Sequence, residues 1–313
     1  MVTIPSTGDE QLQKAKFDPG LTQQYGGPLR RAINNDGTFN VIRRGTSWRD
    51  FHPYLQLVSV SWATFFALLL AGYTALNVIF ASVYYVLGPH ALKGGMAGNQ
   101  FLTAFYFSSQ TLTTVGFGSI APNSHAANLL AAFEALIGLL GFAVATGLLF
   151  GRVSRPSARI GFSERALIAP YQEGASLQFR VVNRRENSLI EPEARVLLMT
   201  VERNGPSVRR NYTALNLERP SVLFLPLTWT VVHPIDSESP LWNKTAEQLV
   251  EAEAELLILI KAWDETFSQT VHQRYSYRFD EIIWNARFTP AFTVGSNGDL
   301  VLDVGKVGDY AKV

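Results

Sequence analysis

The chain of 313 residues contains no cysteine, which excludes disulfide bonds and cysteine-ligated metal sites. Neither sign of charge dominates, because 27 lysine and arginine residues stand against 26 aspartate and glutamate residues. A nearly neutral chain offers no bulk attraction to nucleic acid, and we expect no such partner. The N-terminal region also lacks the basic start, apolar stretch and small-residue cleavage site of a secretory signal peptide. We therefore expect the N-terminus to remain in the cytoplasm.

Charge is scarcest in the first half of the chain. Between Asp50 and Arg152, the only lysine, arginine, aspartate or glutamate residues are Lys93 and Glu134. A charged side chain at the centre of a membrane helix costs about 2.5–3.5 kcal/mol, so uncharged runs of this length indicate segments that face hydrocarbon. The alternative is the core of a large soluble protein.

Two segments, Val58–Leu87 and Ala126–Phe150, exceed the roughly 20 apolar residues that a helix needs to cross a bilayer. Basic residues lie before the first segment and after the second: Arg43, Arg44, Arg49, Arg152, Arg155 and Arg159. Because such residues concentrate on the cytoplasmic side, both termini are predicted to be cytoplasmic and residues 88–125 to face outward.

The segment between the two spans is neither a simple loop nor a third span, because its apolar part, Asn99–Leu112, is too short to cross a bilayer. Residues 88–98 resemble a turret-like loop, and Asn99–Leu112 (NQFLTAFYFSSQTL) suits a short re-entrant helix with Asn99 as its N-cap. A glycine-containing run, Thr113–Ser119, then returns to the surface. Non-helical backbone is tolerated at membrane depth only if protein buries it or it lines a wet cavity, so this arrangement predicts a pore.

The glycine-containing run includes Thr114-Val115-Gly116-Phe117-Gly118, which matches the potassium filter pattern TVGYG at all but one position. In such a strand, carbonyl oxygens replace the water shell of K⁺, and glycine reaches the required backbone angles without a Cβ clash. We expect K⁺ to bind at residues 114–117, with the Thr114 hydroxyl as the innermost ligand. One chain supplies one strand, so a closed pore requires a C4 homotetramer.

The remaining regions are predicted as follows. Residues 1–45 form a cytoplasmic N-terminal segment, and residues 46–57 form an amphipathic interfacial slide helix that Pro53 must bend or break. An ordinary linker is the alternative for the latter. The pore domain covers residues 58–152, with a pore helix at 99–112 and a filter at 114–118, and a linker covers 153–159.

From Ile160 the sequence consists of short stretches of alternating apolar and polar residues, separated by turn residues. This pattern predicts a cytoplasmic β-sandwich over residues 160–313. The clearest stretches are Ser176–Asn183, Ala194–Val201, Leu227–Val232, Glu255–Lys261 and Thr270–Tyr277. One helix is expected at Thr245–Glu255, and a hairpin or edge strand from Gly295 onward. The predicted fold class is an α-helical membrane pore, with two transmembrane helices and a re-entrant pore helix, joined to an all-β immunoglobulin-like domain.

With these features, the chain resembles a prokaryotic inward-rectifier potassium channel (the KirBac group of the Kir family). Beyond the filter, the resemblance rests on three matching runs: Arg152-Val-Ser-Arg155-Pro156, His233-Pro-Ile235-Asp236-Ser-Glu-Ser239-Pro240-Leu241 and Asp280-Glu281-Ile-Ile-Trp284. The resemblance implies a homotetramer in a bacterial inner membrane, a pore extended by immunoglobulin-like cytoplasmic domains, and regulation by anionic lipids at the membrane-facing linkers.

The resemblance also assigns roles along the second span. Counting back from Pro156, Phe150 falls at the bundle-crossing gate, Gly138 at a proposed hinge, and Phe142 where strong rectifiers carry an acidic residue. Phe142, Thr146 and Phe150 share one helix face by their spacing. Because Phe142 is apolar, block by Mg²⁺ or polyamines is expected to be weak.

The filter surroundings depart from the family pattern. Phe117 replaces the usual tyrosine, Ser119 a common acidic residue, and Gln110 a frequent glutamate of the pore helix. Gln110 and Glu134 are the predicted filter supports: Glu134, an ionisable residue within a span, is a functional candidate by default. It is expected to accept hydrogen bonds from the pore helix or the filter backbone, or otherwise to reach interfacial water.

Basic residues near the cytoplasmic surface attract anionic lipid by about 1 kcal/mol each. The predicted lipid site, for example for a phosphoinositide, comprises Trp48, Arg49, Arg152, Arg155 and Arg159. The positive-inside rule explains these residues equally well.

No catalytic or metal-binding pattern is found, so we expect a channel and not an enzyme, with K⁺ as the permeating ion and no cofactor. The predicted function is a potassium-selective tetrameric channel, gated at the inner helix bundle by movement of the cytoplasmic domain and by anionic lipid. The alternatives are a weakly selective cation channel and a membrane-anchored sensor with a non-conducting pore.

Overall fold

A computed structural model describes residues 20–21, 31–45, 47, 52–95, 98–155, 158–204 and 207–313. The chain divides into two compact units. One unit, residues 44–155, is helical, and the other combines residues 1–43 with residues 156–313 and is built from β-strands.

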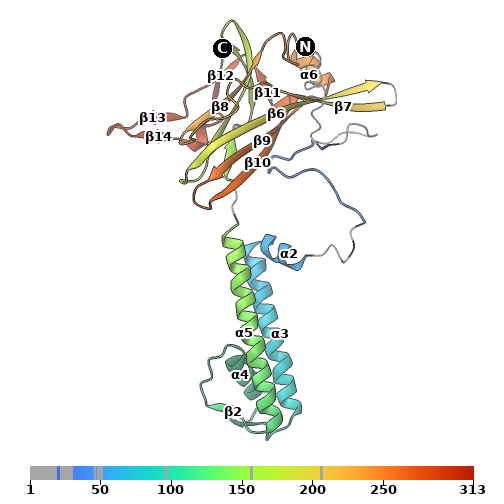
Figure 1. Cartoon of the computed structure of the whole chain (residues 1–313), viewed down its shortest axis with the longest axis vertical. Coiled ribbons are helices and arrows are strands. Elements are labelled where there is room, and N and C mark those ends of the chain that lie inside the picture. Colours follow the sequence, from blue (N-terminus) through green and yellow to red (C-terminus); the bar gives the residue numbers. More distant parts are fainter. Residues whose placement is uncertain are drawn as a thin grey trace, which may run out of the picture. The chain divides into compact units, whose positions relative to one another are not determined.

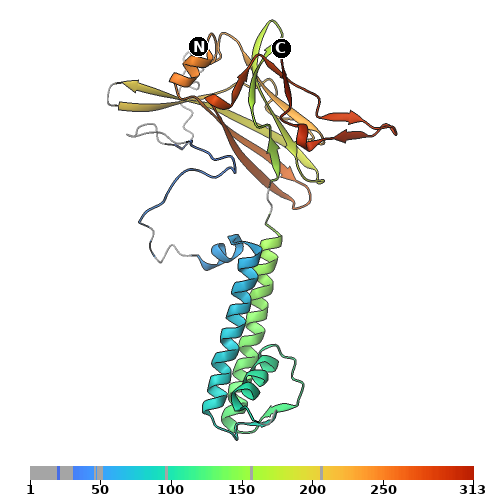
Figure 2. The ribbon, with the colours of Figure 1, turned by 180° about the vertical axis from the view of Figure 1, so that it is seen from behind.

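The helical unit is dominated by two long helices, α3 (Trp62–Val86) and α5 (His125–Val153), which run side by side when seen from the front and from behind (Figures 1 and 2). Both are long and apolar enough to cross a membrane. Each begins at a serine: the side chains of Ser61 and Ser124 accept hydrogen bonds from the backbone N–H groups of Thr64 and Ala127. These helices lie at the two predicted spans.

The segment between the long helices folds back against them. It contains the short helix α4 (Gln100–Leu112), capped by the Asn99 side chain, which accepts from the Leu102 N–H. Two short strands, β1 (Leu92–Gly94) and β2 (Ile120–Pro122), pair antiparallel on either side of α4 in the sequence. The loop before α4 and the chain after the filter are therefore held together by backbone hydrogen bonds.

The helix that precedes α3 differs from the expected interfacial helix over residues 46–57. The observed α2 covers Pro53–Ser59. Proline lacks an N–H and its φ is fixed near a helical value, so it suits the first turn of a helix and not its interior. The helix therefore starts at Pro53, and residues 46 and 48–51 lie outside the described residues.

The β unit confirms the expected sandwich, because its core fills the space between two sheets. The first sheet has the order β10-β9-β6-β7, and the second β11-β4-β5-β3, with β8 also paired to β5. The first sheet comprises Gln269–Arg278 (β10), Glu255–Asp264 (β9), Leu189–Asn204 (β6) and Ser207–Ala214 (β7). The second comprises Ile282–Trp284 (β11), Ala166–Tyr171 (β4), Gly174–Asn183 (β5), Ile160–Phe162 (β3) and Thr228–Ile235 (β8). Buried side chains from both sheets, among them Phe179, Trp229, Ile258 and Tyr277, form one cluster.

Two further strand pairs and one helix complete this unit. Strands β12 (Ala286–Phe288) and β15 (Tyr310–Lys312) pair antiparallel, and β13 (Phe292–Val294) and β14 (Leu300–Leu302) form a hairpin that projects from the sandwich (Figure 1). The hairpin therefore begins before Gly295, where it was expected to start. Helix α6 (Ala246–Glu251) is shorter than the expected helix at 245–255, because Glu255 already belongs to β9.

The N-terminal segment is fastened to the sandwich by two charged side chains. The Arg31 guanidinium donates to both carboxylate oxygens of Glu281, over 3.0 and 2.8 Å, and to the Ser276 hydroxyl. Glu255, which is 2% exposed, accepts from the backbone N–H of Ala32 over 3.1 Å. These contacts were not predicted, because residues separated by more than 200 positions meet here.

A buried histidine closes the loop after β8. The His233 ring lies 2.6 Å from the Asn216 carbonyl oxygen through Nδ1 and 2.8 Å from the Ser239 hydroxyl through Nε2. The same hydroxyl accepts from the Leu241 N–H. Burial lowers the pKa of His233, although the Asn216 carbonyl and Asp236 oppose this shift. The neutral ring therefore holds the loop.

This histidine makes the stability of the β unit depend on pH. Below about pH 6.5 the unfolded chain binds a proton at His233 that the folded chain resists, so the contribution of the neutral ring is lost as pH falls toward the folded-state pKa. We expect the melting temperature of the wild type to fall more steeply between about pH 7 and about pH 5 than that of His233→Gln. Thermal unfolding measures this, with the exposed His272→Gln as control. Parallel curves for wild type and His233→Gln would contradict it.

Candidate functional site

The backbone of the predicted filter alternates between two conformations. Thr114, Gly116 and Gly118 have φ values of 58°, 55° and 79°, while Val115 and Phe117 between them do not have positive φ. An alternation of positive and negative φ is the backbone pattern that lets successive carbonyls point to the same side of an extended segment. Rings of such carbonyls are the means by which potassium filters replace the hydration shell of the ion.

The positive φ of Thr114 was not predicted from the sequence, which suggested special backbone angles only at the two glycines. For a β-branched residue such a φ is an outlier that costs of the order of 1–3 kcal/mol. Hydrogen bonds to the end of α4 hold it in place. The N–H groups of Val115 and Gly116 both donate to the Gln110 carbonyl, over 2.9 and 3.3 Å, and the Thr114 N–H donates to the Thr111 carbonyl. Gln110 thus contacts the filter through its backbone.

A single chain leaves the filter uncovered. All residues from 113 to 119 are exposed, including the apolar side chains of Val115 (54%) and Phe117 (76%). Exposed apolar side chains grouped in this way are typical of a surface that another molecule covers.

The predicted gate residues lie together on α5. Phe142, Thr146 and Phe150 are all exposed in the single chain, with Phe142 at 74% and Phe150 at 71%. Their spacing places them on one face of the helix. Gly138, one turn before Phe142, is instead buried.

Gly138 marks the closest approach of α5 to α4. A Cβ atom at this position would lie 2.0 Å from the Leu112 carbonyl oxygen and 2.8 Å from its carbonyl carbon. Since α5 continues without interruption through Gly138, the structure gives this glycine a packing role in addition to the hinge implied by resemblance. Any side chain here would push against the residue that precedes the filter segment.

Glu134 is fully buried, one turn before Gly138. Its carboxyl group accepts a hydrogen bond from the Tyr84 hydroxyl of α3 over 2.9 Å and a short one from the Ser108 hydroxyl of α4. It therefore reaches the pore helix, one of its two predicted targets, and within the described part of the chain it makes no hydrogen bond to the filter backbone. Tyr84 and Ser108 were missed, because neither stands out from other polar residues in apolar segments.

Of the predicted lipid-binding residues, Arg152 is already engaged. Its guanidinium donates to the carbonyls of Leu57 and Val60, over 2.6 and 2.7 Å, at the end of α2. It also lies over the rings of Trp62 and Phe65, at 4.6 and 4.7 Å from their centroids. These contacts tie the end of α5 to the start of α3.

The other predicted lipid-binding residues differ in their surroundings. Arg155 and Arg159 are exposed, whereas Trp48 and Arg49 lie outside the described residues. The structure does not bring these residues together with Arg152 into one described site.

Comparisons with known proteins bear on both units. The sequence profile described as "Ion channel" matches residues 72–155, and the one described as "Inward rectifier potassium channel C-terminal domain" matches residues 160–313. The chain is 37% identical over 286 residues to the inward rectifier potassium channel Kirbac3.1 of Paramagnetospirillum magnetotacticum, which covers 90% of this chain and 96% of that protein.

More distant relatives are eukaryotic. The chain is 26% identical over 294 residues to the human G protein-activated inward rectifier potassium channel 2, covering 85% of this chain and 69% of that protein. It is 30% identical over 319 residues to the bovine G protein-activated inward rectifier potassium channel 4, covering 93% of this chain and 75% of that protein.

The position of Gly138 leads to a prediction about packing. Gly138→Ala should destabilise the helical unit by about 1–3 kcal/mol, since the new methyl group overlaps the Leu112 backbone. The matched control is Gly147→Ala, because a Cβ at Gly147 meets no atom within 4 Å in the same helix. Thermal unfolding of the detergent-solubilised protein measures both variants. Equal stability of the two would refute the packing role.

Proposed function

Because the chain belongs to the inward rectifier potassium channel family, we propose that four copies form a potassium-selective pore in which residues 114–118 of each copy supply the ion ligands. The observation that carries this proposal is the alternating backbone of the filter, held at the end of a short helix between two apolar helices. Each K⁺ would be coordinated by rings of carbonyls from residues 114–117, with the Thr114 hydroxyl as the innermost ligand.

Four-fold symmetry supports the filter geometrically. In the proposed filter, one segment with alternating φ would present its carbonyls on one side only, so a single chain could not surround an ion. A closed C4 ring supplies the other sides and lets neighbouring chains cover Val115 and Phe117, which are exposed in one chain. Because backbone carbonyls and not the side chain of residue 117 would coordinate the ion, K⁺ coordination would be preserved although Phe117 stands where tyrosine is usual.

We place the gate at the other end of α5 from the filter. In a tetramer the exposed face of Phe142, Thr146 and Phe150 would line the inner pore, and each phenylalanine would form a ring of four. Such a ring blocks ions sterically and by excluding water. The absence of a carboxylate at Phe142 leaves little attraction for Mg²⁺ or polyamines, so rectification by these blockers is weak.

The proposed membrane orientation places both termini and the β unit in the cytoplasm of a bacterial cell, with residues 88–125 outside. Anionic lipid, for example a phosphoinositide, would interact with the exposed Arg155 and Arg159 and with Trp48 and Arg49. Arg152 contributes indirectly, since its contacts with Leu57 and Val60 join α2 to the helix that carries Phe150. Movement of the β unit and lipid binding would both act on this end of α5.

Rubidium uptake tests conduction and selectivity. Liposomes that contain the purified protein and are loaded with K⁺ should accumulate ⁸⁶Rb⁺, and added external K⁺ should compete with the tracer far better than Na⁺ does, because the filter carbonyls match K⁺. Empty liposomes serve as control. Equal competition by Na⁺ would favour a weakly selective cation channel and overturn the selectivity claim.

The gate is tested by a pair of neighbouring variants. Phe150→Ala should raise ⁸⁶Rb⁺ uptake by about tenfold, which corresponds to removal of about 1.4 kcal/mol from the barrier at the constriction. Leu149→Ala removes a similar apolar volume from an adjacent position of the helix and should change the uptake little. A Phe150→Ala channel with wild-type uptake, or equal effects of both variants, would show that the gate lies elsewhere.

A further inference from the structure

Polar side chains are buried inside the helical unit at the level of the pore helix. Asn77 of α3, Ser108 of α4 and Glu134 of α5 have no exposed surface, and Tyr84 of α3 is 1% exposed. A polar side chain in an apolar environment is unfavourable unless it has hydrogen-bond partners, and lipid supplies none. Their hydrogen-bond partners must therefore come from the protein itself.

The contacts connect all three helices in one chain of hydrogen bonds. The Tyr84 hydroxyl donates to Glu134 over 2.9 Å, and the Ser108 hydroxyl lies within hydrogen-bond distance of both Glu134 and the Asn77 Oδ1, the latter over 3.1 Å. The Asn77 amide in turn donates to the Tyr73 carbonyl over 2.8 Å, within α3. We call the four side chains Asn77, Tyr84, Ser108 and Glu134 the brace.

A second link lies beside the brace. The Tyr73 hydroxyl of α3 is 2.7 Å from the Ser109 hydroxyl of α4. Tyr73 and Asn77 are separated by one helical turn, so both point toward the same part of α4. The two consecutive serines of α4 are thus each held by a side chain from α3.

These serines come directly before the residue that holds the filter. Ser109 is followed by Gln110, whose carbonyl accepts from the N–H groups of Val115 and Gly116. The Ser109 carbonyl also accepts from the N–H of Thr113. A shift of the last turn of α4 therefore moves the Gln110 carbonyl, the acceptor that holds the first amides of the filter.

We propose that Asn77, Ser108 and Tyr84 are positioning residues for ion conduction, which with Glu134 hold the last turn of α4, and thereby the filter, at a fixed place between α3 and α5. The proposal rests on the proposed function, because it assigns these residues to the filter of that pore. Glu134 acts from behind the pore helix and not by contact with the filter backbone.

The number of hydrogens available for hydrogen bonding predicts how substitutions at Glu134 should differ. Ser108 has a single hydroxyl hydrogen but two acceptors nearby, Asn77 and Glu134. A glutamine at 134 would accept from Tyr84 and donate to Ser108, which leaves the serine hydrogen for Asn77 and completes the chain. Glu134→Gln should therefore preserve the brace, whereas Glu134→Leu should remove it.

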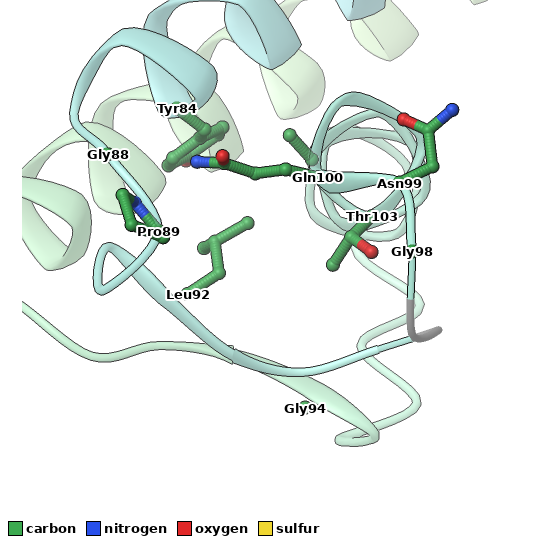
Figure 3. A pocket seen from close by; sticks show the side chains of 10 residues that line it. Tyr84, Gly88, Pro89, Leu92, Gly94, Gly98, Asn99, Gln100 and Thr103 are labelled. Carbon is green, nitrogen blue, oxygen red and sulfur yellow. The ribbon is translucent and has the colours of Figure 1, made fainter.

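Tyr84, at one end of the brace, also borders a pocket, so the effect of its hydroxyl must be separated from that of its ring. Tyr84, Leu92, Asn99, Gln100 and Thr103 are among the residues that line this pocket of about 340 Å³ (Figure 3). The Tyr84 ring also packs edge-on against Phe107, with ring centroids 5.1 Å apart. Tyr84→Phe removes only the hydroxyl that reaches Glu134 and keeps the ring in both contacts.

The test compares Ser108→Ala and Tyr84→Phe with two matched controls in the full chain. Ser82→Ala removes an exposed hydroxyl from α3 that bonds to the Val78 carbonyl of its own helix, and Tyr85→Phe alters an exposed tyrosine next to Tyr84. Two quantities are measured: amide hydrogen exchange in peptides that cover α4 and the filter, and competition of Na⁺ with ⁸⁶Rb⁺ uptake.

We expect Ser108→Ala, Tyr84→Phe and Glu134→Leu each to speed exchange at the Val115 and Gly116 amides by about fivefold, the factor that one buried hydrogen bond contributes. Competition by Na⁺ should rise in the same variants. Glu134→Gln, Ser82→Ala and Tyr85→Phe should match the wild type in both measurements.

Wild-type exchange in Ser108→Ala and Tyr84→Phe would overturn the proposal. So would an equal effect of the control variants, or a Glu134→Gln protein that behaves as Glu134→Leu does. If the wild type passes no K⁺, the proposed function fails, and the exchange measurement alone then decides whether the brace positions the filter segment.

Discussion

In hydrocarbon, every backbone amide and carbonyl must find its partner within the protein or at a bound ion, and the filter segment is where this constraint is hardest to meet. Helices α3 and α5 satisfy it internally. Residues 114–118 do not, because they are neither helical nor part of a β-strand. Their first amides bond to the end of α4 instead, and in the proposed tetramer ions and neighbouring chains would complete the surroundings of the segment.

Contacts from α3 and α5 fix the position of α4 within the helical unit. Gly138 lets α5 approach the Leu112 backbone directly, and Glu134, one turn earlier, joins α5 to α4 and α3 through hydrogen bonds. At the far end of α5, Arg152 binds the carbonyls that end α2. Helix α5 thus packs against α4 near its middle, carries Phe150 near its C-terminal end, and is attached there to α2. In the proposed channel, a displacement of α2 would therefore act on the end of α5 that carries Phe150.

The β unit is stabilised by an apolar core and by hydrogen bonds between charged side chains and the N-terminal segment. Its core is apolar and closes between two sheets, and its buried carboxylates Glu255 and Asp264 accept hydrogen bonds from backbone N–H groups. Glu255 binds the N–H groups of the N-terminal segment, and Arg31 of that segment binds Glu281. The N-terminal residues described in the structure are thereby part of the same unit as the C-terminal domain, although the whole helical unit separates them in sequence.

Hydrophobicity, caps and turn residues act over short distances, and they were sufficient to predict the two apolar helices, the pore helix with Asn99 as its cap, the glycines of the filter and the β-sandwich. Contacts between distant residues decided the rest. The sequence signalled that Glu134 mattered but not that Tyr84 and Ser108 bind it, and it presented Arg152 as a free surface cation when its guanidinium is bound to carbonyls and aromatic rings. The positive φ of Thr114 could likewise not be predicted from the sequence, because no local preference favours it. Only the hydrogen bonds to the end of α4 hold Thr114 in this conformation. Local propensity depends on the residues of one segment. The hydrogen-bond partner of a buried polar group depends on which distant segments pack against it, and only the tertiary structure shows that packing.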